Sequence, residues 1–159
     1  ITDPEEKIMN EILPDLLKDR RVNNSMQRRL LGTSSQIGKG IIGKEVNFSL
    51  ESLWVNFQNK GEFNPLHDHG GFLSFVIWID IPYDIKEEHQ IPWVKKSGAP
   101  SAGSFVFVNS QGNPITLKTS KSWNGKICLF PSSLKHLVYP FYTKEERRIS
   151  ISGNIIFNP

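Results

Sequence analysis

The sequence contains very little cysteine and no long apolar run. Cys128 is the only cysteine among 159 residues, so no disulfide can form within the chain, and a disulfide-rich secreted scaffold is excluded. No stretch of about 18 apolar residues is present, as a membrane-spanning helix would require, and no charged and then apolar leader precedes the first expected helix. We therefore expect a cytoplasmic protein that does not enter a membrane.

Charge of either sign is also scarce. Charged residues make up 22% of the chain and the formal net charge is +3, whereas 38% of the residues are hydrophobic. This balance excludes a disordered chain and indicates a packed globular protein. The positive excess lies mainly in residues 18–21 and 28–29, where it indicates the solvent-facing side of a helix rather than a nucleic-acid surface. The length fits one domain, and we predict a single domain over residues 1–159.

The hydrophobic pattern changes its period once along the chain. Apolar residues recur every three to four positions in residues 8–17, and we assign residues 1–44 to an N-terminal helical segment. From residue 45 onward, short runs with strand character alternate with turn residues, which predicts an antiparallel sandwich or barrel over residues 45–159. A long polar excursion over residues 83–103 should lie on the surface. The predicted strands are residues 46–58, 72–81, 104–109, 115–118, 126–130, 136–141 and 147–157.

Three of the four histidines stand beside predicted strands. His67 and His69 are one residue apart, so their side chains would share one face of a strand. His136 begins a later strand, and the turn residues 143–146 predict that this strand forms a hairpin with the one that follows. Such a hairpin would place Arg148 beside His136. Three imidazoles can hold one face of a divalent transition metal, which makes these histidines a candidate metal site.

Arg148 and Ser150 give the candidate site a second component. They are two residues apart, so both side chains would face the same pocket. An arginine can hold a carboxylate through two parallel hydrogen bonds, and a serine hydroxyl can add a third. The pattern predicts that a dicarboxylate binds next to the metal.

In five stretches the sequence resembles the 2-oxoglutarate- and Fe(II)-dependent oxygenases, and more narrowly the oxygenases of tailed phages of marine bacteria. The resemblance extends over residues 52–156. It implies an α+β, mainly β fold: a double-stranded β-helix, also called a jelly roll or cupin-like barrel, with the N-terminal helices packed on one sheet. It also implies the cytoplasm of a bacterial or phage-infected cell. The stretches are residues 52–56, 64–69, 73–78, 129–136 and 147–152.

The same resemblance implies what the site contains. The expected activity is that of a dioxygenase that decarboxylates 2-oxoglutarate and hydroxylates an unknown substrate, with no catalytic residue beyond the metal site. The expected partners are this small-molecule co-substrate and dioxygen, and the expected metal is Fe(II). The metal ligands would be His67, His69 and His136, and the residues that contact 2-oxoglutarate would be Arg148, Ser150 and Ser74.

One position departs from the pattern of these oxygenases. They commonly have His-x-Asp or His-x-Glu, whereas His69 stands at the acidic position here. Asp68 would not replace the missing acid, because on a regular strand its side chain points away from His67. Three neutral imidazoles without a carboxylate leave the metal more positively charged than usual.

The histidine spacing also resembles that of cupins. Gly61 precedes the His67-x-His pair by five intervening residues, and Gly125 similarly precedes Pro131, with His136 beyond it. Two alternatives therefore stand beside the oxygenase: a cupin-like three-histidine metalloprotein that does not use 2-oxoglutarate, and a non-catalytic phage jelly-roll module that binds a partner.

Four further side chains complete the expectations. Trp54, Phe75 and Trp78 alternate within apolar strands and are expected in the core rather than in contact with substrate. His89 belongs to the polar excursion and is expected in solvent.

Overall fold

The structure of the protein is a computed structural model in which residues 47–158 are described. The predicted helical segment over residues 1–44 lies outside these residues, as do both basic clusters. The prediction of one domain over the whole chain therefore stays a prediction. Residues 50–156 form a compact unit by themselves, and the site described below lies within it.

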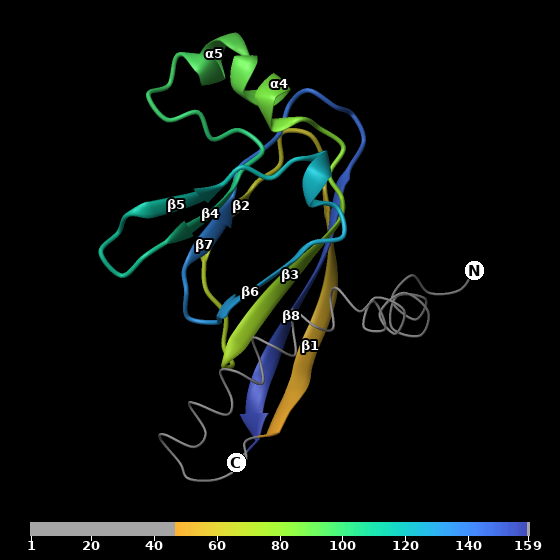
Figure 1. Cartoon of the computed structure of the whole chain (residues 1–159), viewed down its shortest axis with the longest axis vertical. Helices are drawn as coiled ribbons and strands as arrows, with labels where there is room; N and C mark the ends of the chain where they lie inside the picture. The colour runs from red at the N-terminus through yellow and green to blue at the C-terminus, as the bar shows by residue number, and fades with distance from the viewer. Residues whose placement is uncertain (1–46, 159) are drawn as a thin grey trace, which may run out of the picture. The chain divides into compact units, whose positions relative to one another are not determined.

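Eight strands in this part of the chain form two four-stranded sheets (Figure 1). The strand order is β1-β8-β3-β6 in the first sheet and β2-β7-β4-β5 in the second. The chain passes back and forth between the sheets, which is the winding of the predicted jelly roll. The strands are β1 (Asn47–Gln58), β2 (Asn64–His67), β3 (Leu73–Asp80), β4 (Phe105–Val108), β5 (Pro114–Leu117), β6 (Ile127–Pro131), β7 (His136–Val138) and β8 (Arg148–Asn158).

The core lies between the two sheets. β3 is apolar along most of its length because it lies between β8 and β6 and is buried on both faces. Trp78 of β3 is fully buried, and its ring meets that of Phe105 in β4 edge to face, with 6.0 Å between centroids. The placement of Trp78 in the core is therefore confirmed, whereas Phe75 is buried but lies outside the core cluster and lines the pocket described below. The core cluster contains Val76, Trp78, Ile81, Tyr83, Phe105, Phe107, Phe130, Val138 and Phe141.

The prediction that β7 and β8 form a hairpin is wrong. β7 pairs with β2 and β4, whereas β8 pairs with β3 in the other sheet. The chain leaves β7 after Val138 and crosses to the first sheet over residues 139–147, a connection too long for a tight turn. Residues 143–146 bend the chain within this crossing rather than reversing a strand. Arg148 therefore lies in the sheet opposite His136.

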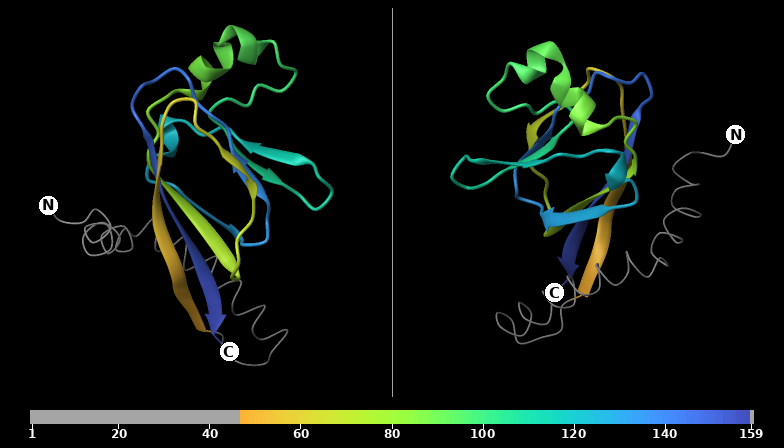
Figure 2. Two further views of the ribbon diagram at one scale, coloured as in Figure 1. Left: turned by 180° about the vertical axis from the view of Figure 1, so that it is seen from behind. Right: turned by 45° about the horizontal axis from the view of Figure 1, so that its top comes forward.

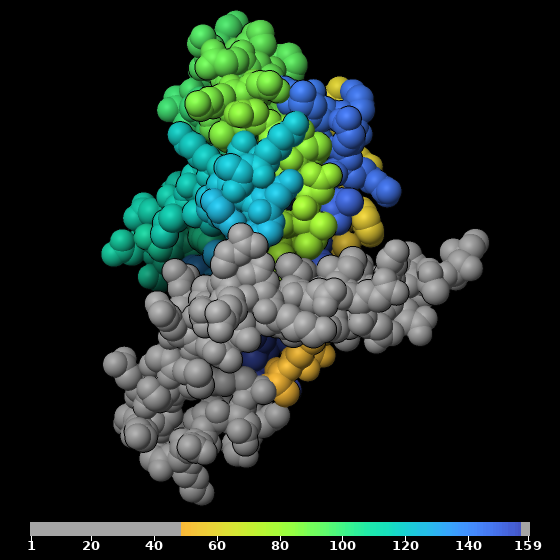
Figure 3. All heavy atoms as spheres, turned by 45° about the vertical axis from the view of Figure 1, so that its right-hand side comes forward, coloured from red at the N-terminus to blue at the C-terminus, as the bar shows by residue number. Residues whose placement is uncertain are grey.

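The excursion contains two short helices, α4 (Ile85–Gln90) and α5 (Pro92–Lys95), at one end of the sheets (Figure 2). The side chain of Asp84 caps α4 by accepting a hydrogen bond of 2.8 Å from the backbone N–H of Lys86. Figure 3 shows the atoms of this segment against the connection between β7 and β8. No helix within the described residues is long and apolar enough to cross a membrane.

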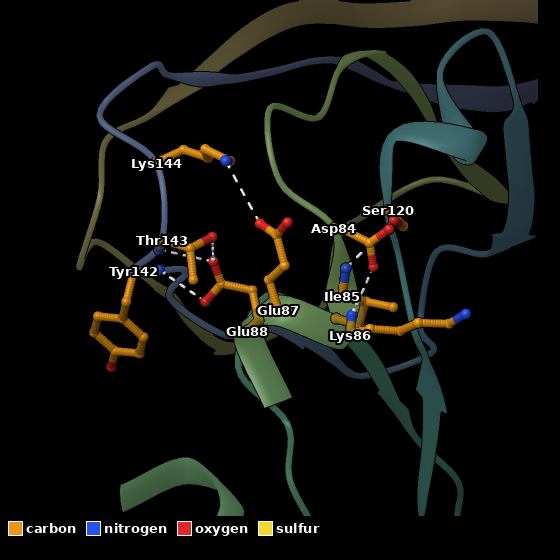
Figure 4. A network of polar contacts seen from close by, with 9 residues as sticks. All are labelled: Asp84, Ile85, Lys86, Glu87, Glu88, Ser120, Tyr142, Thr143 and Lys144. Carbon is orange, nitrogen blue, oxygen red and sulfur yellow. Dashed lines mark hydrogen bonds and ion pairs between the residues drawn. The ribbon is translucent and has the colours of Figure 1, made fainter. Parts of the chain in front are cut away.

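Glu88 fastens α4 to the connection that leads into β8 (Figure 4). Its carboxylate is fully buried and accepts hydrogen bonds of 2.8 Å from the backbone N–H groups of Tyr142 and Thr143. The hydroxyl of Thr143 donates a third bond to it. A buried carboxylate is unfavourable unless it is well hydrogen-bonded, so these donors explain how an acid in a polar segment can be buried.

The prediction that His89 lies in solvent is wrong. Its side chain is half-buried, and its Nε2 atom is buried. Burial lowers the pKa of the imidazole, and the neighbouring backbone of Ala102 partly opposes this shift. The sequence pattern failed here because α4 packs inward instead of projecting into solvent.

We predict that Glu88→Gln destabilises the protein by about 1 to 3 kcal/mol, since an amide NH₂ would then face a buried backbone N–H that has lost its acceptor. Glu87→Gln is the matched control on the same helix. It removes only an ion pair of 3.5 Å with Lys144 near the surface, which should cost less than about 1 kcal/mol. Urea-induced unfolding measures both changes, and equal losses would contradict the role given to Glu88.

Candidate metal centre

Two of the three histidines face each other across paired strands. His67 ends β2 and His136 begins β7, and they are partners in the antiparallel register. Their ring centroids are 4.2 Å apart. The register of β2 is irregular between Asn64 and His67. Asn64 and His67 therefore both line the pocket, although on a regular strand residues three positions apart would face opposite sides. Strand pairing thus sets the distance between the first two candidate ligands.

The same hydrogen bond orients each of these rings. Nδ1 of His67 lies 2.7 Å from the carbonyl oxygen of Pro65, and Nδ1 of His136 lies 3.0 Å from that of Leu134. A carbonyl can only accept, so Nδ1 carries the proton in both residues. In the neutral imidazole, Nε2 then has a free lone pair. This is how metal-binding histidines are commonly oriented.

His69 lies two residues beyond the end of β2. Its backbone N–H donates to the carbonyl of Ser132 at 3.0 Å. The His69 ring centroid is 5.0 Å from that of His67 and 5.1 Å from that of His136. Asp68, between the two histidines, is exposed. The structure therefore brings the three predicted ligands together and leaves the neighbouring acid outside.

The spacing of the three rings suits one metal ion. One nitrogen of each ring lies within 4.8 Å of the others. Bonds between a metal and an imidazole nitrogen are about 2.0–2.1 Å long, so two nitrogens on one ion lie no more than about 4.2 Å apart, and the rings would draw together on binding it. Three nitrogen donors suit the later divalent transition metals, Fe(II) among them.

Burial keeps two of these imidazoles neutral. It lowers the pKa of His136 to about 4; the hydrogen bond to Leu134 opposes the shift, and the neighbouring histidines add to it. Burial, followed by the nearby His67, also lowers the pKa of His69. Neutral imidazole is the form that binds metals, so both residues are ready to bind near neutral pH.

The histidines line a pocket of about 860 Å³ with walls from both sheets. Arg148 enters it from β8, together with Ser150. The prediction that Arg148 shares the pocket with His136 is thus met through a different topology, across the pocket rather than along a hairpin.

Arg148 is 4% exposed, and its Nη1 donates a hydrogen bond of 3.0 Å to the hydroxyl of Tyr83. No ion pair joins it to a carboxylate among the described residues, whose ion pairs involve other side chains. A buried cation without a carboxylate is unfavourable by itself. The arrangement is therefore suited to binding an anion.

Ser150 belongs to a polar strip beside the arginine. Asn56 of β1 donates from Nδ2 to the hydroxyl of Ser152 at 3.0 Å and to that of Ser150 at 3.4 Å. All three side chains line the pocket. The strip adds donors and acceptors next to Arg148.

Ser74 does not join them. It is buried in β3, where its hydroxyl lies 2.8 Å from Oδ1 of Asn154 and 3.0 Å from the hydroxyl of Ser132. It is not among the residues that line the pocket. Its hydrogen bonds are those of a structural residue, so Ser74 is not part of the proposed site.

Tyr83 and Trp54 were not expected at the site from the sequence. Tyr83 is fully buried behind Arg148, and the available signal was an aromatic residue directly after the proline that ends a buried strand. Trp54, expected in the core, lines the pocket with its ring centroid 5.4 Å from that of His69. Apolar alternation along a strand does not distinguish a residue of the core from one that lines the pocket.

A family model described as "Putative 2OG-Fe(II) oxygenase" matches residues 52–154. The chain belongs to this oxygenase family. The match contains the three histidines, Arg148 and Ser150, and confirms the resemblance to the 2-oxoglutarate- and Fe(II)-dependent oxygenases. The narrower likeness to phage oxygenases stays a prediction.

One solved structure with a TM-score above 0.5 has a similar fold, and two others match more weakly. A 2OG-Fe(II) oxygenase family oxidoreductase from Burkholderia pseudomallei has a TM-score of 0.56 at 15% identity, over 92% of this chain and 57% of that one. A Pseudomonas putida prolyl-4-hydroxylase has a TM-score of 0.44 at 17% identity, over 65% of this chain and 51% of that one. A cupin domain from Bordetella pertussis Tohama I has a TM-score of 0.38 at 10% identity, over 72% of this chain and 94% of that one. This chain thus spans little more than half of the Burkholderia and Pseudomonas structures. The curated proteins contain no match.

The low pKa of His136 predicts how the stability of the metal-free protein depends on pH. An unfolded chain has an ordinary imidazole pKa near 6.5, whereas the folded His136 stays neutral down to about pH 4. Between these values the unfolded state binds more protons, so the free energy of unfolding decreases as the pH falls. We expect His136→Asn to lose less stability than the wild type over this range. Urea unfolding in a chelator measures it, and parallel pH profiles would contradict the prediction.

Proposed function

We propose that the protein is a 2-oxoglutarate-dependent dioxygenase of the hydroxylase type, with Fe(II) held by His67, His69 and His136. The observation that carries the proposal is Arg148, a buried cation with no carboxylate partner among the described residues, in the same pocket as three imidazoles. The reaction would convert 2-oxoglutarate and dioxygen to succinate and carbon dioxide while a substrate C–H group becomes C–OH. Fe(II), when bound, supplies the centre at which dioxygen is activated.

The charges in the pocket favour a dicarboxylate. Three neutral imidazoles do not reduce the charge of a divalent metal, and Asp68 is exposed and offers no compensation. Arg148 adds a further positive charge from the other sheet. A dianion such as 2-oxoglutarate, with one carboxylate at each end, would compensate both charges at once.

The protein's own groups would have two roles: polar side chains would bind the co-substrate, and apolar side chains would form part of the pocket wall. Arg148 uses one of its five N–H donors on Tyr83, which leaves others for the far carboxylate of the co-substrate. Ser150 stands two residues along the same strand and lines the same pocket. Apolar side chains form part of the pocket wall, and electrostatic interactions strengthen where such a wall excludes water. These side chains are Val76, Phe105, Phe130 and Val138.

The third histidine is also compatible with one other candidate function. A cupin-like metalloprotein could bind a metal through the same three imidazoles and act without 2-oxoglutarate. Arg148 distinguishes the two, because it would have no ligand in such a protein. In that case Arg148→Gln would leave the function intact, whereas in a 2-oxoglutarate-dependent enzyme it would abolish use of the co-substrate.

The direct test is co-substrate binding and turnover. Protein loaded anaerobically with Fe(II) should bind 2-oxoglutarate in a calorimetric titration, and it should release succinate once air is admitted. His136→Ala should lose the metal and both activities. His89→Ala should keep them, because His89 lies on α4 and does not line the pocket.

Two results would count against the proposal. Loaded wild-type protein that neither binds 2-oxoglutarate nor forms succinate would refute it. Tight metal binding without any response to 2-oxoglutarate would favour the cupin-like candidate, and failure to bind metal at all would favour a non-catalytic module.

We further expect Tyr83→Phe to weaken 2-oxoglutarate binding about tenfold, because a hydrogen bond to a charged group is removed. The Tyr83 hydroxyl donates its only proton to the carbonyl of Gly103 at 2.6 Å, so its oxygen accepts from Arg148. In the variant that carbonyl keeps a bond of 2.8 Å from the hydroxyl of Thr119. The change therefore acts mainly on the arginine.

The matched control is Thr119→Val, which removes the other hydrogen bond to Gly103 and leaves Arg148 paired with Tyr83. Its dissociation constant for 2-oxoglutarate should equal that of the wild type. The analogue 2-oxobutanoate lacks the far carboxylate and should bind the wild type and Tyr83→Phe equally well. A uniform loss for both ligands would mean that Tyr83 acts on the whole fold instead.

A further inference from the structure

His69 is oriented differently from the other two histidines. The rings of His67 and His136 each donate a hydrogen bond from Nδ1 to the carbonyl two residues earlier. Among the described residues, no hydrogen bond holds the His69 ring, and its ring neighbours are Trp54, His67 and His136. It also lies beyond the last residue of β2, so strand pairing does not set its direction. Something else must hold this imidazole toward the centre.

Trp54 lies against the His69 ring. The two ring centroids are 5.4 Å apart, with 54° between the planes. Trp54 belongs to β1 in the first sheet, whereas the other ring neighbours of His69 are the two histidines themselves. Trp54 is half-buried, lines the pocket and does not belong to the core cluster. Its indole is therefore the ring neighbour of His69 that belongs to neither of the other candidate ligands.

We propose that Trp54 is a positioning residue of the metal centre, whose indole holds the His69 imidazole toward His67 and His136 in place of a hydrogen bond. The inference rests on the metal site of the proposed function. Trp54 would contact the metal ligand His69 but neither the metal nor 2-oxoglutarate.

The two kinds of support have different consequences. A hydrogen bond to Nδ1 fixes both the tautomer and the direction of a ring. A packed indole only excludes the side-chain rotamers that would turn the ring away. Without the indole, His69 could rotate into the space it occupied, and ordering the ring would then oppose metal binding. Loss of an outer partner of a metal ligand typically weakens metal affinity about 10- to 100-fold.

Titration with Co(II), which reports its coordination through visible absorption, tests the inference without any turnover. Trp54→Ala should weaken Co(II) binding about tenfold or more and change the spectrum in the same way as His69→Ala. The double variant should bind no more weakly than His69→Ala, since Trp54 acts only through that ring. Trp54→Phe keeps an aromatic ring at the contact and should recover most of the affinity.

Two further variants complete the experiment. Trp93→Ala is the control, because Trp93 is 65% exposed on α5 and does not line the pocket; it should bind Co(II) as the wild type does. Trp54→Leu retains apolar volume without a ring, so it provides the same comparison if Trp54→Ala does not fold. It should also weaken Co(II) binding, and by more than Trp54→Phe.

The outcomes separate this inference from the proposed function. Wild-type affinity and spectrum in Trp54→Ala or Trp54→Leu would overturn the role of Trp54 alone. An additive loss in the double variant would also overturn it, since Trp54 would then act through another group. A wild-type protein that binds no Co(II) would overturn both this inference and the metal site on which it rests.

Discussion

The antiparallel pairing of β2 with β7 is the interaction on which the candidate centre depends. It places His67 opposite His136, and each ring is oriented by a carbonyl of its own chain segment two residues earlier. The backbone that forms the sheet thus also fixes the tautomers of two candidate ligands. A metal bound here would join two strands that are already paired, and its binding free energy would add to the stability of the folded state.

The second constraint is the burial of Arg148 in the opposite sheet. Its hydrogen-bond partner Tyr83 stands where β3 leads into the excursion, and the Tyr83 hydroxyl donates to Gly103 at the other end of that excursion. Gly103 has a φ of +72°, and a Cβ there would lie 2.7 Å from the Tyr83 ring, so only glycine allows this approach. Glu88 fixes α4 of the excursion to the segment before Arg148. The excursion therefore helps to fix the position of Arg148.

Much of this arrangement could be predicted from the sequence because local patterns carry it. The strands follow from apolar patterning, and the His67-x-His69 spacing with a distant His136 identifies the trio, although His69 lies beyond the end of β2 and not on one face of a strand with His67. The crossing after β7 could not be predicted, because residues 143–146 give the same turn signal in a hairpin and in a connection between sheets. The partners of β7 and β8 are chosen by packing between distant segments. Burial of Glu88 is also invisible locally, since its backbone donors come from 54 and 55 residues further along the chain.

The proline in β2 has an effect on assembly as well. β2 stands at the edge of its sheet among the described strands, with the exposed Phe63 directly before it and the exposed Leu66 within it. Such an edge can recruit a strand from another molecule through its free backbone groups. Pro65 has no N–H to offer, and its carbonyl is already bonded to the His67 ring. The bond that orients a candidate metal ligand therefore also makes this edge a poor template for aggregation.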